Sequence, residues 1–366
     1  MQDLQKILQK LIQFKTVTGN SKEVDKALSW IEKEIKSPFL FVEKFIFNGY
    51  PSLIIGPAKT KKPKLILAAH IDVVPASKNL FLPRIRKGKI FGRGAFDMKF
   101  AVACYLKLLK ELGKEIKKYN LSVLLTSDEE TGGFNGTKKI LEKGYCPQVC
   151  FLPDGGKDWQ LEQKSKSIWQ IEVVSQGKSS HGARPWLGEN AIEKLVFFLE
   201  FLKKKFPAEP CGDKLHLHNT LNVGKIEGGE AINKVPAQAR AWVDMRLVNS
   251  RDRKKLLNYF GKLRKKFPGV EIKEVVFSEG NEVDIKNKFV SLFRNIAFEK
   301  YGIRMKPVIS HGSSDARFFS KKKIPVVVTR LKGGGLHSEN EWIDIHDLER
   351  FYQVMKEFVE KVARKE

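Results

Sequence analysis

The sequence predicts an α/β protein in which a ferredoxin-like module interrupts a layer of strands and helices. In the first half of the chain and near its C-terminus, short apolar runs alternate with helical patterns, which is typical of a largely parallel sheet. Between these parts the expected order of elements is β-α-β-β-α-β, the arrangement of a ferredoxin-like sandwich. We therefore expect an interrupted domain of residues 1–167 and 281–366, with an insertion of residues 168–280.

The interrupted domain is built from apolar runs that predict buried strands and from segments with apolar residues at helical spacing. The expected strands are residues 65–69, 121–126, 149–152 and 324–329. The expected helices are residues 1–14, 98–112, 137–143 and 347–365. In the insertion we expect, in order, a strand at 168–176, a helix at 189–206, strands at 217–226 and 238–247, a helix at 251–267 and a strand at 270–277.

Composition excludes several classes of protein. The chain has 366 residues, 42% of them apolar and 30% charged, which is typical of a globular protein and excludes disordered and collagen-like chains. No apolar run approaches the roughly 18 residues of a membrane span, so no membrane partner is expected. Four cysteines without an export signal fit reduced thiols, which predicts a cytoplasmic protein.

The net charge is +25, from 67 lysines and arginines against 42 acidic residues. Its basic clusters are short, scattered and rich in lysine, and they lack interleaved aromatic residues. Nucleic acid is therefore not the expected partner, although binding of another polyanion stays open.

Cys211, His216 and His218 lack a fourth ligand and match no zinc-finger spacing, which argues against a structural zinc site.

Polar side chains follow the predicted strands. His70 and Asp72 follow the first run, residues 128–130 (Asp-Glu-Glu) follow the second, and Asp154 follows the third. Asp97 ends a glycine-rich approach to a predicted helix, which it could simply cap. In open α/β sheets ligands bind beyond the carboxyl ends of the strands, so we expect these groups to converge there.

Converging carboxylates repel one another unless a cation compensates them. Oxygen and imidazole ligands without cysteine suit catalytic Zn²⁺, with Mn²⁺ and Co²⁺ as alternatives. More than four such groups favour two ions that share a bridging ligand. Taken singly, each residue could also be structural, since a lone histidine after a strand is often only hydrogen-bonded.

Five segments carry a resemblance to a known family. The segments are His70–Pro75, Gly92–Lys99, Asp128–Glu130, Gly177–His181 and Asn233–Pro236. In order and spacing they resemble the M20 family of di-zinc amidohydrolases, which includes desuccinylases, deacetylases, aminoacylases, carboxypeptidases and dipeptidases. The resemblance implies a di-zinc aminopeptidase-like α/β catalytic domain with an inserted lid, through which the chain forms a homodimer.

The resemblance also implies a set of ligands for two Zn²⁺ ions. One ion would be held by His70, Asp97 and Asp154, and the other by Asp97, Glu130 and His337, with Asp97 as the bridge. Asp72 matches the carboxylate that orients His70. Glu129 matches the general base, which takes a proton from water and later delivers it to the leaving amine.

Further residues match substrate-binding positions of the family. His181 resembles a histidine that reaches an active site across the dimer interface and donates to the developing oxyanion. Asn233 and Arg246 match positions that grip the α-carboxylate of the substrate. Gly312 and Ser313 lie in a loop that would bind a substrate carboxylate through hydroxyl and backbone N–H groups.

The expected activity is zinc-dependent hydrolysis of the amide bond of an N-acyl amino acid. The loop at residues 313–317 favours an enzyme like succinyl-diaminopimelate desuccinylase or acetylornithine deacetylase. The segment 179–186 and Ala69 depart from that pattern, so a dipeptidase or carboxypeptidase acting on short peptides is the alternative. An alternative of another class is a catalytically retired, polyanion-binding protein on the same scaffold.

Overall fold

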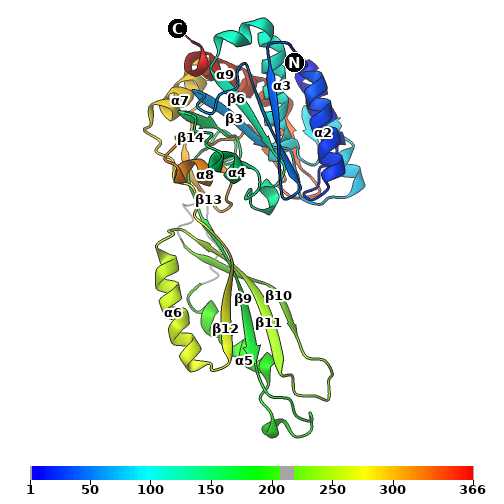
Figure 1. Ribbon diagram of the computed structural model, residues 1–366, viewed down its shortest axis with the longest axis vertical. Coiled ribbons are helices and arrows are strands. Elements are labelled where there is room, and N and C mark those ends of the chain that lie inside the picture. Colours follow the sequence, from blue (N-terminus) through cyan, green and yellow to red (C-terminus); the bar gives the residue numbers. More distant parts are fainter. Residues whose placement is uncertain (1, 207–217, 366) are drawn as a thin grey trace. The chain divides into compact units, whose positions relative to one another are not determined.

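A computed structural model describes residues 2–206 and 218–365, which form two compact units. The first unit comprises residues 1–164, 281–310 and 314–366, and the second comprises residues 165–280 with the short segment 311–313. Figure 1 shows the chain entering the second unit and returning. The predicted boundaries at 168 and 280 lie close to this division. Cys211, His216 and the predicted strand start at Leu217 lie outside the described residues.

The first unit contains a six-stranded sheet of order β1-β2-β6-β3-β7-β14. Strands β6, β3, β7 and β14 run parallel to one another. At one edge β2 pairs antiparallel with β6 and β1 pairs antiparallel with β2, and neither β1 nor β2 was among the predicted strands. Every residue of β3 and β6 is buried. The strands are β1 (Phe41–Phe47), β2 (Tyr50–Gly56), β3 (Leu65–His70), β6 (Leu121–Thr126), β7 (Val149–Phe151) and β14 (Val326–Val327).

Helices bury the apolar side chains of this sheet in one continuous core. Helices α3 and α9 contact each other and β3, α1 contacts α3, and α7 contacts α9. The helices of the unit are α1 (Gln2–Gln13), α2 (Ser21–Glu34), α3 (Phe100–Leu112), α4 (Thr137–Glu142), α7 (Lys288–Tyr301), α8 (Ala316–Lys321) and α9 (Ile345–Ala363). Among the described residues, no helix is long and apolar enough to cross a membrane.

A small antiparallel sheet brings two distant parts of the first unit together. Its order is β15-β16-β5-β4, formed by β4 (Arg84–Arg86), β5 (Lys89–Phe91), β15 (Gly333–Gly334) and β16 (Trp342–Asp344). The loop that carries Asp97 follows β5, and the segment that carries His337 lies between β15 and β16. This pairing therefore places the two segments side by side. A further pair joins β8 (Leu161–Ser165) to β13 (Pro307–Ser310).

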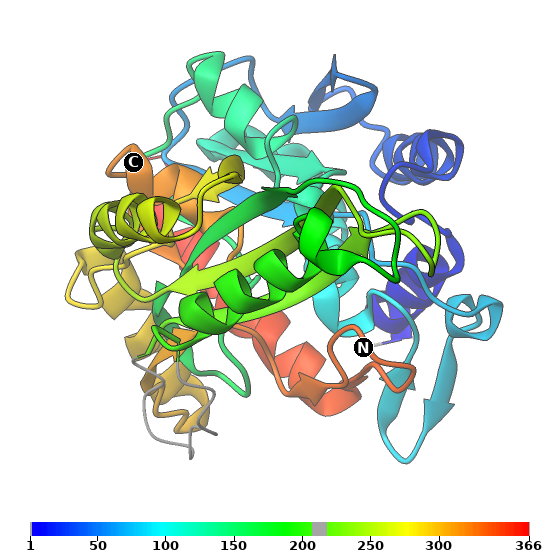
Figure 2. The same cartoon turned by 90° about the horizontal axis from the view of Figure 1, so that it is seen from below.

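The second unit has the β-α-β-β-α-β order that the periodicity predicted. Its elements are β9 (Ser167–Gln176), α5 (Ala191–Lys203), β10 (Thr220–Gly228), β11 (Gln238–Leu247), α6 (Asp252–Lys266) and β12 (Val270–Ser278). The strands form an antiparallel sheet of order β10-β11-β9-β12. Alternate residues of β11 are buried in a core shared with both helices. Figure 2 shows α5, in green, lying along these strands.

Candidate metal centre

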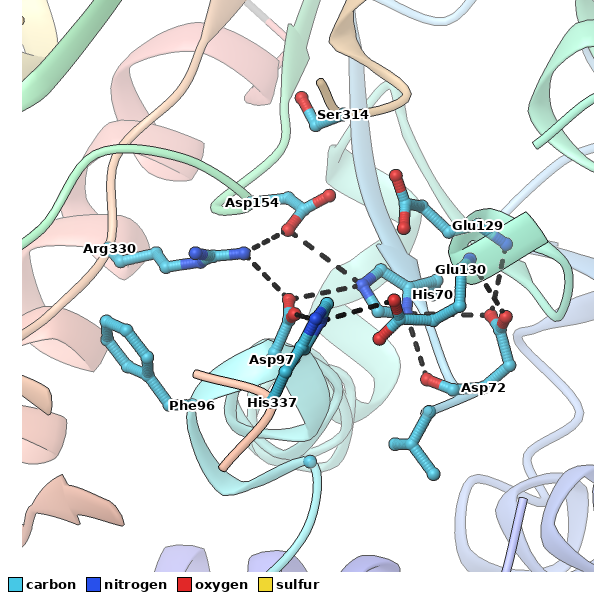
Figure 3. A network of polar contacts seen from close by, with 12 residues as sticks. His70, Asp72, Phe96, Asp97, Glu129, Glu130, Asp154, Ser314, Arg330 and His337 are labelled. Atoms are coloured by element: carbon cyan, nitrogen blue, oxygen red, sulfur yellow. Dashed lines mark hydrogen bonds and ion pairs between the residues drawn. The ribbon is translucent and has the colours of Figure 1, made fainter. Parts of the chain in front are cut away.

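The carboxyl ends of the parallel strands carry the polar residues that the sequence singled out. His70 is the last residue of β3 and pairs in register with Thr126, the last residue of β6, so Glu129 and Glu130 follow close by. Asp154 follows β7, the other neighbour of β3. Figure 3 shows that His70, Asp97, Glu130, Asp154 and His337 converge. This convergence arises because parallel neighbours end at the same sheet edge.

Three of these side chains form the first group, His70, Asp97 and Asp154, which are all buried. The Nε2 atom of His70 lies 3.5 Å from Oδ1 of Asp97 and 3.8 Å from Oδ1 of Asp154. Among the described residues, no side chain or backbone group makes a hydrogen bond to this buried nitrogen. A buried imidazole nitrogen facing two carboxylate oxygens at these separations is a donor set that suits a divalent cation.

The second group comprises Asp97, Glu130 and His337. The Nε2 atom of His337 lies 3.0 Å from Oδ2 of Asp97 and 3.3 Å from Oε2 of Glu130. Asp97 therefore presents Oδ1 to the first group and Oδ2 to the second, which is the geometry of a bridging ligand. His337 has about half of its side chain exposed, and its neighbours Asp97 and Glu130 raise its pKa to about 10.

Asp97 lies in a turn that departs from the predicted helix. Asp97 and Met98 have non-helical backbone angles, with φ of −130° and −134°, so helix α3 begins at Phe100 and not at Met98. A carboxylate from distant sequence holds this turn. The carboxylate of Glu341, which is fully buried, accepts hydrogen bonds from the backbone N–H groups of Gly94, Phe96 and Asp97 and from the guanidinium of Arg93.

Asp72 contacts the two glutamates through its carboxylate and His70 through its backbone carbonyl. The carboxylate accepts hydrogen bonds from the backbone N–H groups of Glu129 and Glu130, at 3.3 and 3.2 Å, and from the hydroxyl of Thr18 at 2.8 Å. The Nδ1 atom of His70 is closer to the backbone carbonyl of Asp72, at 3.0 Å, than to its carboxylate, at 3.5 Å. A hydrogen bond from Nδ1–H to that carbonyl would leave Nε2 unprotonated and able to bind a cation.

Glu129 and its neighbour Glu130 have different surroundings. The Glu130 carboxylate belongs to the second group, whereas the Glu129 carboxylate belongs to neither group, and the backbone N–H of Glu129 donates to Asp72 (Figure 3). Burial, followed by the negative charge of Asp154, raises the pKa of the Glu129 carboxyl well above its usual value. A carboxyl whose pKa is raised toward neutrality is suited to accept and return a proton.

Arg330 also lies beside the two groups, although it was not among the residues predicted from the sequence. Its Nη2 atom donates to Oδ1 of Asp97 at 2.7 Å and to Oδ1 of Asp154, and its guanidinium lies over the Phe96 ring (Figure 3). Although burial raises the pKa of Asp97, the charge of Arg330 and hydrogen bonds from both histidines lower it more. No local pattern in the segment around Arg330 indicates this role.

The loop at residues 314–317 supports the turn that follows Glu130. Arg317, which is buried, donates to the backbone carbonyls of Ser314 and Gly132, and Asp315 accepts a hydrogen bond from the hydroxyl of Thr137. A Cβ atom at Gly133, whose φ is +61°, would lie 1.8 Å from Oδ1 of Asp315, so only glycine fits there. Gly312 and Ser313, predicted to bind substrate, group with the second unit.

The remaining predicted residues lie in the second unit. His181 is exposed, and its segment pairs with that of Asn233, since Gly182 N–H donates to the Asn233 carbonyl at 2.7 Å. Arg246 lies on β11, where its Nε donates to Asp244 at 2.9 Å. The structure therefore brings His181 and Asn233 together within this unit. Their contacts with a substrate, and that of Arg246, stay predictions.

Comparison with known proteins gives matches along most of the chain. The model of peptidase family M20/M25/M40 matches residues 66–361. A succinyl-diaminopimelate desuccinylase of Rickettsia akari (strain Hartford) is 28% identical over 97% of this chain and 98% of its own. Another enzyme of that name, from Sulfurovum sp. (strain NBC37-1), is 27% identical over 96% of this chain and 97% of its own.

Solved structures share the fold. A tripeptidase from Staphylococcus aureus superposes with a TM-score of 0.80 at 20% identity, covering 100% of this chain and 99% of that one. A Bacillus subtilis protein described as a dinuclear metal-binding peptidase of the M20 family superposes with a TM-score of 0.66 at 16% identity, covering 98% of this chain and 97% of that one. At these identities the likeness shows the fold.

Proposed function

The chain belongs to peptidase family M20/M25/M40, and from this premise we propose that it is a metal-dependent hydrolase that cleaves the amide bond of an N-acyl amino acid. The observation that carries the proposal is the pair of ligand groups joined by Asp97, with Glu129 beside them. The similarity to enzymes named succinyl-diaminopimelate desuccinylase favours a substrate of that kind.

We propose that the two groups hold two divalent cations, with Zn²⁺ as the first choice and Co²⁺ or Mn²⁺ as alternatives. The donor set of imidazole nitrogen and carboxylate oxygen fits such ions. The dinuclear metal-binding peptidase with the same fold supports this proposal. Cations bound there would polarise the scissile carbonyl and lower the pKa of a water molecule.

The residues around the cations would have different roles in the reaction. Asp72 orients His70 through its backbone carbonyl and fixes both glutamates through their N–H groups. Glu129 would accept a proton from water at its carboxylate and return it to the leaving nitrogen. Glu341 holds the turn of Asp97, so the bridging carboxylate is positioned before substrate binds.

The substrate would be gripped by residues outside the metal centre. In this proposal Asn233, Arg246, Gly312 and Ser313 bind its carboxylate groups, and His181 donates to the oxyanion. His181 would come from the partner subunit of a homodimer formed through the second unit. We place the enzyme in the cytoplasm, as the cysteine usage predicted.

A peptidase that acts on short peptides is the second candidate, because a protein described as a tripeptidase shares the fold of the chain. Assays of the zinc-loaded protein on succinyl-diaminopimelate, acetylornithine and a panel of dipeptides separate the candidates. We expect the highest kcat/KM on the succinylated substrate. If no substrate is hydrolysed, or if Glu129→Ala hydrolyses each as fast as the parent, the proposal of a hydrolase is wrong.

A further inference from the structure

We propose that Arg330 makes the two metal positions unequal, because its guanidinium competes with a cation at the first group and leaves the second group to bind the first equivalent of metal. The inference rests on the metal-dependent function proposed above and deepens it. It assigns a positioning role to a residue that lies among the ligands without being one.

Arg330 contacts the same oxygen atoms that face His70. Its Nη2 atom donates to Oδ1 of Asp97 and Oδ1 of Asp154, the two atoms that lie 3.5 and 3.8 Å from His70 Nε2. A cation bound to these three ligand atoms would therefore share both oxygens with a guanidinium that stays charged at all accessible pH values. Repulsion between the two positive groups weakens binding there, and more strongly because the site is buried.

The second group has no comparable competitor. The oxygen that Asp97 presents to it, Oδ2, faces His337, and Arg330 donates to the other oxygen. Within residues 2–206 and 218–365, no lysine or arginine forms an ion pair with Glu130. A cation at the second group would thus meet the Asp97 oxygen that Arg330 does not contact, so the guanidinium would compete with it less directly than with a cation at the first group.

Arg330 is held where it lies. Its backbone carbonyl accepts a hydrogen bond from the N–H of Trp159, and the nearby Val328 carbonyl accepts one from the N–H of Glu162. Its side chain is 9% exposed and packs over the Phe96 ring at 5.2 Å. A surface arginine could turn into water when a cation arrives, whereas the buried side chain of Arg330 keeps its charge close to the first group.

The same contact has the opposite effect on the metal-free protein. Asp97 and Asp154 are both buried, and Arg330 offsets their mutual repulsion. Removing its charge is therefore expected to lower stability in the presence of a chelator while tightening metal binding. A residue with only a structural role would not produce opposite changes in these two measurements.

The order of filling is tested with the full-length protein, stripped by a chelator and titrated with Zn²⁺, and separately with Mn²⁺, in a calorimeter at constant pH. The parent is expected to bind in a tight and a weak step. Glu130→Gln, which alters only the second group, should remove the tight step. Asp154→Asn, which alters only the first group, should remove the weak step. The opposite assignment, or two equal steps, would overturn the proposal.

The role of Arg330 is tested with Arg330→Met, which replaces the guanidinium side chain with a shorter, unbranched and uncharged one. We expect the weak step to tighten about tenfold or more and the melting temperature in chelator to fall. Arg253→Met is the matched control, since it removes the same charge from an ion pair with Glu274 in the second unit, and we expect unchanged metal binding. Unchanged or weaker binding at the weak step of Arg330→Met contradicts the proposal.

The outcomes also separate this inference from the proposed function. If Arg330→Met does not fold, the titrations of Glu130→Gln and Asp154→Asn still decide the order of filling. If the parent binds no metal at all, both the inference and the metal-dependent function are wrong. If the first group binds metal before the second and the protein still hydrolyses its substrate, the proposed role of Arg330 is wrong and the proposed hydrolase function stands.

Discussion

The two candidate ligand groups share Asp97 and differ in burial and in nearby charge. The first group is enclosed, with His70, Asp97 and Asp154 all less than a tenth exposed, and Arg330 supplies a positive charge beside it. The second group ends in His337, which is about half exposed and lies on a loop. Similar ligands in different surroundings are therefore expected to bind metal, and to tolerate mutation, differently.

The largest effect is expected at Glu129, the residue that we propose to transfer the proton and that belongs to neither ligand group. Glu129→Gln should lower kcat by roughly 10²–10⁴-fold, because the amide cannot take a proton from water. Both steps of metal binding should persist, since Glu129 belongs to neither group. Steady-state kinetics and calorimetry measure the two properties. The exposed Glu142→Gln on α4 serves as the control, and a loss of metal binding by Glu129→Gln would mean that the residue is a ligand.

A second prediction concerns the turn that carries Asp97, the residue shared by the two ligand groups. Glu341→Ala removes the buried acceptor of three N–H groups and of the Arg93 guanidinium, and should lower the free energy of unfolding by about 3–5 kcal/mol. Denaturant unfolding in the presence of a chelator measures this. Glu339→Ala, on the exposed part of the same loop, should change stability by about 0.5 kcal/mol or less. Equal effects of the two substitutions would refute a special role for Glu341.

The two histidines test the difference in burial directly. In chelator, His70→Ala should lower the free energy of unfolding by about 2–4 kcal/mol, because it empties a buried position and leaves polar neighbours without a partner. His337→Ala should cost about 1 kcal/mol or less, because its half-exposed site admits water. The same unfolding experiment on both variants checks this. A larger loss for His337→Ala would reverse the comparison.

The smallest predicted effect is a dependence of stability on pH near the first group. Burial raises the pKa of Glu162 from 4.5 to about 7, so between these values the folded protein binds more protons than the unfolded chain. The contribution of Glu162 to stability is therefore present below pH 4.5 and is lost as pH rises through 7.

Glu162→Gln removes this contribution. From pH 5 to pH 7.5 the parent should lose on the order of 2 kcal/mol more stability than the variant. Denaturant midpoints at the two pH values measure the difference, and Glu282→Gln, at an exposed position nearby, is the control. If the parent and Glu162→Gln lose stability equally, Glu162 does not titrate in this range.

Much of the centre was predictable because its residues lie next to strands that their own sequence specifies. An apolar run that ends at Ala69 predicts where His70 emerges, and the same holds for Glu129, Glu130 and Asp154. His337 could be chosen over His311 only by resemblance to a family. Its position depends on a small sheet whose two-residue and three-residue strands, β15 and β16, are too short to give a pattern.

The sequence by itself determined the order of the elements, the β-α-β-β-α-β insertion and the residues at the ends of the parallel strands, since each of these depends on the spacing of nearby residues. Only the tertiary structure decided that β1 and β2 extend the sheet in antiparallel fashion, that Glu341 holds the turn of Asp97 and that Arg330 lies against the first group. Each of these features joins residues that lie more than sixty positions apart in the sequence. No local sequence pattern predicts which partner a buried charge will have. They form during folding because a buried charged group is costly in free energy unless a partner compensates it.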